Sequence, residues 1–338
     1  MDQRKIYIRA KGGLAHGWGH IVRANTLAEY IASSEGKYKI LMSVEGDEAV
    51  RKFMSTRGVP FKYFPIGTTA NEKDVVNKFA PDVVVIDMLE ASEAMLSFYK
   101  EYCDKLVIFN DMGRDYPVGN VIISPQFLQS YPKKYIGQKH LNGPDYFILS
   151  KSILEAKVNA GMREFSHIAK SLLVIMGGCI SNKVFKELIK VIEDILGINI
   201  KITFIVGYDS DVNLDSYHYL RQRGVTFVEE TDNVGRFMAE ADLALASSGY
   251  VKYELATLGT PALLVSVVDH QEILGTVFAQ KSGAAEYIGN ILNIELKEIV
   301  CAVKHLILNK SKRKEMSEAG MCLMDGSALL RIERELVS

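Results

Sequence analysis

The sequence predicts an α/β protein with two doubly wound domains, and three observations carry this prediction. The chain has 338 residues, enough for two domains of about 150 residues each. Short β-branched runs alternate with segments of helical spacing, which is typical of a parallel sheet with helices on both faces. The alternation stops in a proline-rich stretch and then starts again. We place the boundary near residue 155, which gives domains of 1–155 and 156–338.

In the first domain, buried strands are expected at 6–9, 39–44, 83–87 and 105–110. Segments near 20–34, 47–57 and 92–102 carry apolar residues at helical spacing. Between about 112 and 165 the pattern is interrupted by four prolines, Pro117, Pro125, Pro132 and Pro144. Such clustering indicates loops and a domain connection.

In the second domain, the alternation continues through expected strands at 172–176, 202–206, 225–228, 243–245 and 262–268. From residue 294 onward the pattern is helical, and this tail could pack back against the first domain. Open parallel sheets bind ligands at the carboxyl ends of their strands. Functional residues are therefore expected in the loops that follow the strands.

Composition excludes several classes of protein. Forty basic and forty-one acidic residues leave a net charge of −1, which disfavours a nucleic-acid partner. The longest apolar runs fall far short of the ~20 residues that span a bilayer, and the N-terminus lacks the apolar segment of a signal peptide. The four cysteines, Cys103, Cys179, Cys301 and Cys322, form no CxxC pair, so neither a disulfide framework nor a zinc site is expected. We expect a cytoplasmic protein without stable membrane insertion.

A glycine-rich loop follows the first expected strand and leads into a helix. Gly17 and Gly19 would let the backbone approach a nucleotide or diphosphate closely, although the spacing G-x-G-H is not the dinucleotide fingerprint G-x-G-x-x-G. His20 stands where the loop meets the helix, and an imidazole there can act as a general base near neutral pH. Alternatively, His20 only caps the helix or bonds a loop carbonyl. His16 is more typical of a plain loop residue.

Two loops of the second domain could bind a nucleotide. Gly177 and Gly178 follow its first strand. Ser247, Ser248 and Gly249 form a small polar turn at a helix start, which offers hydroxyls and backbone amides to a diphosphate.

A carboxylate and a polar triplet follow these loops. Glu254 lies about one turn into the helix, where its carboxylate could accept both hydroxyls of a ribose, or only favour the helix dipole. The triplet Asp269–His270–Gln271 ends the last expected strand. It is either a site for sugar hydroxyls, with Gln271 as a contact, or a helix start capped by Asp269. Arg23 is expected to contact the sugar, and Arg23 or Lys252 could also neutralise the diphosphate. His, Cys and carboxylate residues show no ligand spacing along the chain, so no metal site is expected.

Several motifs together resemble one protein family. They are G-W-G-H-I-V-R at 17–23, M-G-G at 176–178, A-S-S-G-Y-V-K-Y-E at 246–254, G-T-P-A at 259–262, and Asp325-Gly326 followed by Arg331-Ile332. The family contains the UDP-sugar hydrolase of the pseudaminic acid pathway and the spore-coat polysaccharide biosynthesis proteins. More distantly, the chain resembles the lipid-linked N-acetylglucosamine transferase of peptidoglycan synthesis. The resemblance implies the GT-B architecture, in which two Rossmann-like domains face across a cleft, without a cofactor or an obligatory metal.

The resemblance also implies roles for single residues. His20 matches the base that activates water, and Glu254 matches the acid that binds the ribose. Ser248 and Gly249 match the diphosphate loop, and Gln271 matches a polar contact to the donor.

Two positions depart from the family pattern. Arg9 is followed by Ala10 and Lys11, where the hydrolases commonly carry an Asp two residues after the Arg, and Cys179-Ile180 replace a small residue and Asp.

Three functions follow. The first is a nucleotide-sugar hydrolase, with a UDP-sugar as expected substrate, acting in bacterial nonulosonic acid or surface polysaccharide biosynthesis. The second is a metal-independent glycosyltransferase that uses a UDP- or CMP-sugar donor, in which His20 deprotonates a sugar or protein acceptor. The third is an inactive nucleotide-sugar-binding protein.

Overall fold

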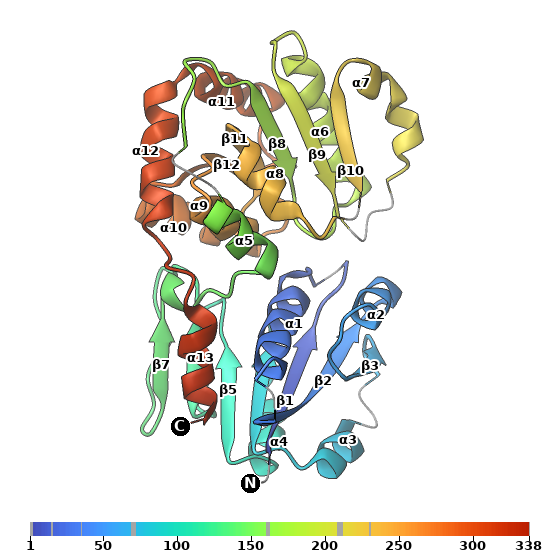
Figure 1. Cartoon of the computed structure of the whole chain (residues 1–338), viewed down its shortest axis with the longest axis vertical. Helices are drawn as coiled ribbons and strands as arrows, with labels where there is room; N and C mark the ends of the chain where they lie inside the picture. The colour runs from blue at the N-terminus through green and yellow to red at the C-terminus, as the bar shows by residue number, and fades with distance from the viewer. Residues whose placement is uncertain are drawn as a thin grey trace. The chain divides into compact units, whose positions relative to one another are not determined.

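The computed structural model describes residues 3–14, 16–34, 36–68, 72–159, 163–207, 212–229 and 231–337. The chain forms two compact units (Figure 1). Unit 1 comprises Met1–Ser150 and Asp325–Ser338, and unit 2 comprises Lys151–Met324.

Unit 1 is built on a parallel sheet of seven strands in the order β3-β2-β1-β4-β5-β6-β7. The strands are β1 (Arg4–Lys11), β2 (Tyr38–Gly46), β3 (Phe61–Pro65), β4 (Val83–Asp87), β5 (Lys105–Phe109), β6 (Val121–Ser124) and β7 (Lys139–Asn142). The helices are α1 (Gly19–Ala32), α2 (Glu48–Ser55), α3 (Glu72–Phe79), α4 (Glu93–Glu101), the 3₁₀ turn η1 (Pro144–Tyr146) and α13 (Ala328–Val337). Every residue of β4 is buried, as expected for a strand inside a parallel sheet, which explains its continuous β-branched sequence.

Unit 2 repeats the plan with six parallel strands in the order β10-β9-β8-β11-β12-β13. They are β8 (Ser171–Ile175), β9 (Lys201–Val206), β10 (Val225–Glu229), β11 (Leu243–Ser247), β12 (Ala262–Ser266) and β13 (Ala285–Asn290). The helical elements are α5 (Lys151–Asn159), α6 (Asn182–Ile195), η2 (Leu214–Tyr217), α7 (His218–Gln222), α8 (Val234–Glu240), α9 (Val251–Thr257), α10 (His270–Ser282), α11 (Leu296–Leu308) and α12 (Lys310–Met321). The predicted α/β fold with two doubly wound domains is therefore confirmed.

The segment predicted to be loops is more regular than expected. β6 and β7 lie within it and extend the sheet of unit 1 by two strands, and α5 follows them. The prolines stand outside these strands, because proline cannot donate a hydrogen bond inside a sheet. Each strand has only four residues, too few to dominate a proline-rich sequence pattern.

The units divide close to the predicted boundary at residue 155, which falls within α5, but two helices are assigned differently from that prediction. α5 belongs to unit 2, where Gly235 on α8 brings the helices together and its amide donates to Ser152 Oγ at 3.1 Å. The expected tail also divides, since α11 and α12 stay in unit 2 whereas α13 returns to unit 1. Ile332 and Leu336 of α13 are fully buried. The second domain predicted at 156–338 therefore needs this correction.

Helix α1 presents one face to the sheet. Ile21, Ala24, Leu27, Ala28 and Ile31 follow the three- and four-residue spacing of a buried helical face, and all are buried. His20 and Arg23 share this spacing and are also buried. Both side chains therefore point toward the sheet.

Among the described residues, no helix combines the length and the apolar character needed to cross a membrane.

Replacing Ile332 by Ala should remove much of the apolar contact that holds α13 on unit 1. We expect a loss of about 2–5 kcal/mol in the free energy of unfolding, because the side chain is fully buried. Leu330→Ala on the same helix is the matched control, since Leu330 is 45% exposed and should change stability by less than about 0.5 kcal/mol. Urea unfolding measures the loss, and amide exchange should locate it in unit 1. Equal effects of the two substitutions would contradict this packing.

Candidate active site

Two hydrogen bonds and one aromatic contact fix the described residues of the glycine-rich loop in unit 1. The Gly13 amide donates to the Gly17 carbonyl at 3.1 Å, and Gly17 has a positive φ of 78°. Asp47, which caps α2, accepts the Leu14 amide at 2.9 Å. Trp18 packs edge-on against Phe53, with ring centroids 5.5 Å apart. This fixed loop leads through Gly19, the first residue of α1, to His20.

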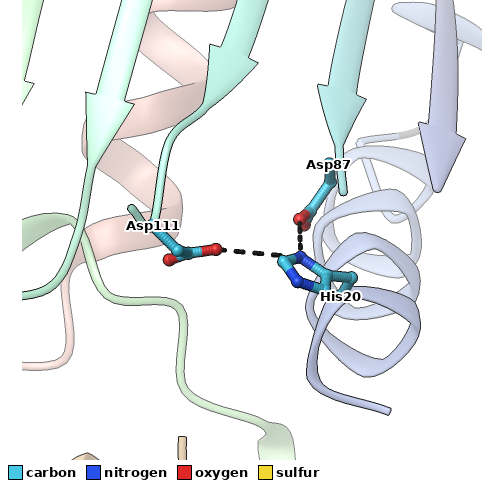
Figure 2. A group of neighbouring side chains, drawn as sticks. All are labelled: His20, Asp87 and Asp111. Atoms are coloured by element: carbon cyan, nitrogen blue, oxygen red, sulfur yellow. Dashed lines mark hydrogen bonds and ion pairs between the residues drawn. The ribbon is translucent and has the colours of Figure 1, made fainter. Parts of the chain in front are cut away.

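His20 faces a buried carboxylate. Its Nδ1 lies 2.8 Å from Oδ1 of Asp87, the fully buried last residue of β4 (Figure 2). A carboxylate can only accept, so this contact assigns the ring proton to Nδ1. The more distant Arg23 Nη2, at 3.4 Å from Nδ1, does not change the assignment. Nε2 then carries the lone pair that can take a proton, as in a His–Asp pair that acts as a general base.

Arg23 binds two carboxylates at once. Its Nε and Nη2 donate to Asp87 at 2.7 and 2.5 Å, and its Nη1 and Nη2 donate to Asp111 at 3.0 and 2.7 Å. The guanidinium also stacks on Phe109, 4.3 Å from the ring centroid. Arg23 is 2% exposed. The expected role of Arg23 in contacting the sugar or the diphosphate is therefore corrected, because its guanidinium is occupied by Asp87 and Asp111 inside the protein.

Asp111 and Gln126 complete this group. Asp111 follows β5, and its Oδ2 lies 3.7 Å from His20 Nδ1 (Figure 2). Gln126 follows β6, and its Nε2 donates to Asp111 Oδ1 at 3.1 Å. The positions of Asp87, Asp111 and Gln126 in this group were not predicted from the sequence. Their common signal was a polar residue at or just beyond the carboxyl end of a buried parallel strand.

His20, Asp87 and Asp111 form a potential metal-binding group that sequence spacing did not indicate. Their ligand atoms lie within 4.8 Å of one another. However, Arg23 already supplies a cation that donates to both carboxylates. A divalent ion would have to displace this buried guanidinium, so the donor set fits an arginine better than a metal.

A second buried ionic network lies at the ends of β1 and β2. Arg9 pairs with Glu45, and its Nε lies 2.9 Å from Glu72. Burial opposes ionisation of Glu45, but hydrogen bonds from the Gly67 amide, Arg9 and Lys11 outweigh it and lower the pKa of this carboxyl. Lys11, which departs from the family pattern, is thus paired with Glu45 at 3.0 Å.

The charge of Lys11 also affects the glycine-rich loop. Burial lowers the pKa of His16, and the neighbouring Lys11 charge lowers it further. His16 is therefore held neutral at physiological pH.

In unit 2, glycines bring the predicted nucleotide loops close together. A side chain on Gly207, after β9, would collide with the Gly178 carbonyl, so these loops pack backbone to backbone. A Cβ on Gly177 would come 4.0 Å from Val251 at the start of α9. At Gly249, a Cβ would approach Gln271 Nε2 to 3.4 Å. The residues predicted in the loops after β8 and β11 therefore lie in one region of unit 2.

Ser248 supports this region from inside. Its hydroxyl donates to the Gln271 carbonyl at 3.0 Å and lies 3.2 Å from Ser266 Oγ, and its amide donates to the Val265 carbonyl at 2.9 Å. Ser248 is fully buried, and the neighbouring Ser247 is 2% exposed. The prediction that the Ser248 hydroxyl and amide contact a diphosphate needs correction, because both already hold β11 to β12 and α10.

Lys252 is also turned inward. Its Nζ donates to the carbonyls of Ser248 and Gly249 at 2.8 and 3.0 Å, and the residue is 1% exposed. It therefore stabilises the turn rather than offering its charge at the surface. Gln271 closes the loop after β12, where its Oε1 accepts the Val267 amide at 3.2 Å. Asp269 stands at the N-cap position of α10 without a capping bond from its side chain.

Glu254 on α9 has an unusual ionisation. Burial raises its pKa to about 7. The carboxyl therefore keeps its proton to a higher pH than an ordinary glutamic acid does, and a partner that donates hydrogen bonds to it would favour the ionised form.

Comparison with known proteins agrees with this architecture. Residues 172–328 match the model described as glycosyltransferase family 28 C-terminal domain. The spore coat polysaccharide biosynthesis protein SpsG of Bacillus subtilis is 22% identical over 97% of this chain and 96% of its own length. The uncharacterized protein MJ1062 of Methanocaldococcus jannaschii is 26% identical over 77% of this chain. The chain covers only 55% of MJ1062, about half of its length.

The crystal structure of MurG from Acinetobacter baumannii has the same fold, with a TM-score of 0.66, 12% identity and 99% coverage of both chains. The predicted GT-B fold is therefore confirmed. The domain match and this fold support an enzyme that acts on nucleotide sugars.

Proposed function

We propose that this enzyme transfers a sugar from a UDP-sugar to the hydroxyl of a sugar or protein acceptor in the synthesis of a surface polysaccharide. The match of residues 172–328 to a glycosyltransferase domain supports transfer rather than hydrolysis, which was our first interpretation of the sequence. Similarity to a spore coat polysaccharide biosynthesis protein supports the biological setting. The observation that carries the reaction is the buried His20–Asp87 pair in unit 1.

In this proposal His20 Nε2 accepts the proton of the acceptor hydroxyl. The acceptor oxygen attacks the anomeric carbon, and the bond from that carbon to the phosphate oxygen breaks. Its electron pair leaves with UDP, so the proton ends on His20 and the negative charge on the leaving group. Asp87 holds the ring through Nδ1, and its charge stabilises the imidazolium that forms.

The donor would bind to unit 2. Backbone amides of the glycine loops at Gly177–Gly178 and Gly249 would contact the diphosphate. The Glu254 carboxylate would accept hydrogen bonds from the ribose, and the Gln271 side chain would contact the sugar. Ser248 and Lys252 would shape the turn from inside, as their buried contacts indicate.

Water in place of the acceptor would make the same site a hydrolase, and an inactive binding protein would release no nucleotide at all. A panel of UDP-, CMP- and GDP-sugars, each with and without candidate acceptors, separates these functions. We expect UDP release that depends on the acceptor. Equal release without any acceptor would replace transfer by hydrolysis, and no release with any donor would replace it by simple binding.

Replacement of His20 by Asn should lower kcat by about 10²–10⁴-fold, because Asn retains a polar side chain but cannot take the proton. The affinity for UDP should stay nearly the same, since the proposed nucleotide contacts lie in unit 2. Steady-state kinetics with and without acceptor, and calorimetry with UDP, measure both quantities. Weaker binding with an unchanged kcat would make His20 a ligand contact instead of a base.

The affinity for UDP should depend on pH through Glu254. The carboxyl accepts two ribose hydroxyls only when it is ionised, and its pKa is raised to about 7. Below that pH a proton must leave before the ribose binds, so the association constant should fall by up to about tenfold per pH unit. Calorimetry from about pH 8 to pH 5.5 measures this decrease.

The matched control for this measurement is Glu254→Gln, which should bind UDP more weakly at pH 8, where two charge-assisted hydrogen bonds are lost. The phosphate of UDP titrates equally with both proteins, so the difference between them isolates Glu254. Parallel pH profiles would place the ribose elsewhere.

Treatment with EDTA should leave turnover unchanged, because Arg23 already occupies the space between Asp87 and Asp111. Nucleotide release is compared before and after chelation and dialysis. Loss of activity that Mg²⁺ or Mn²⁺ restores would reveal a metal requirement.

A further inference from the structure

The ionic group around Arg23 contains two acidic side chains and one basic side chain. Two carboxylates, Asp87 and Asp111, each receive two hydrogen bonds from one guanidinium. With His20 neutral, these three charged side chains sum to −1. All of them are buried, with exposed fractions of 0% for Asp87, 2% for Arg23 and 4% for Asp111. Two buried carboxylates that share one guanidinium favour a further positive charge close to them.

We propose that Arg23 and Asp111 are positioning residues that act through His20. Arg23 fixes Asp87 with two hydrogen bonds, so that Asp87 Oδ1 stays 2.8 Å from His20 Nδ1. Asp111 supplies the second negative charge and lies 3.7 Å from the same nitrogen. This inference rests on the proposed role of His20 as the base.

The charge balance explains why two acids are present. When His20 accepts the proton, the group passes from a net charge of −1 to neutrality. Without the charge of Asp111, the same step would pass from neutrality to +1 in a buried environment, which opposes proton uptake. Asp87 shares its charge between Arg23 and the imidazolium, so the charge of Asp111 adds to the stabilisation that Asp87 gives.

Arg23 connects the two acids, Asp87 and Asp111, through a single atom. The same Nη2 atom donates to Asp87 Oδ1 and to Asp111 Oδ2, at 2.5 and 2.7 Å. The positive charge of Arg23 is therefore shared between Asp87 and Asp111. Gln126 holds Asp111 in place through a hydrogen bond of 3.1 Å.

A double-mutant cycle tests whether Asp111 acts through His20. The four proteins are wild type, His20→Asn, Asp111→Asn and the double variant, each assayed for kcat and for the KM of the UDP-sugar. Asp111→Asn keeps the shape of the side chain and removes its charge. We expect it to lower kcat about 10- to 100-fold with the donor KM within about twofold, and to have almost no further effect when His20 is already Asn. Asp111→Glu, which restores the charge, should recover part of the rate.

The outcomes separate this inference from the proposed function. An equal loss of kcat from Asp111→Asn in both backgrounds, or no loss at all, overturns the positioning role while leaving His20 as the base. An unchanged kcat in His20→Asn overturns the base itself. If Asp111→Asn does not fold, as judged by circular dichroism and thermal unfolding, Arg23→Lys replaces it in the cycle. Lysine keeps the positive charge but cannot form the four hydrogen bonds of the guanidinium. Arg23→Lys should therefore lower kcat only when His20 is present.

Discussion

The double ion pair of Arg23 is the interaction on which the active-site edge of unit 1 depends. A buried carboxylate is stable only when it is paired, and removal of one partner from such a group typically costs about 3–5 kcal/mol. Arg23 satisfies Asp87 and Asp111 together and thereby ties α1 to the ends of β4 and β5. The same contacts orient Asp87 toward His20 Nδ1, because Arg23 donates to both of its carboxylate oxygens.

Two arginine-centred groups lie along the same edge of this sheet, and they differ in charge. Around Arg9, two acids, Glu45 and Glu72, are matched by two cations because Lys11 joins the group. Around Arg23, two acids, Asp87 and Asp111, share one guanidinium, and both lie close to His20. Lys11 thus balances the charge of the first group, whereas in the second group two acids lie beside the imidazole that is proposed to take up a proton.

Much of this architecture could be predicted from the sequence because buried parallel strands such as Val83–Asp87 read as continuous β-branched runs. β6 could not, since four residues between prolines give too short a pattern. His20 was predicted from its place after a glycine-rich loop. Asp87 and Asp111 were missed because they lie 67 and 91 residues from His20, and only the pairing of strands brings them together. The inward orientation of Arg23 and Ser248 was missed for the same reason, because the buried face of an element is defined by its packing.

The return of α13 to unit 1 makes unit 2 an insertion within the sequence of unit 1. During translation, all of Lys151–Met324 is therefore synthesised before the helix that completes unit 1. Unit 2 is continuous and can fold as soon as it leaves the ribosome, whereas the surface that receives Ile332 and Leu336 stays uncovered until α13 has also been synthesised. Unit 1, which carries His20, therefore begins before unit 2 and is completed after it.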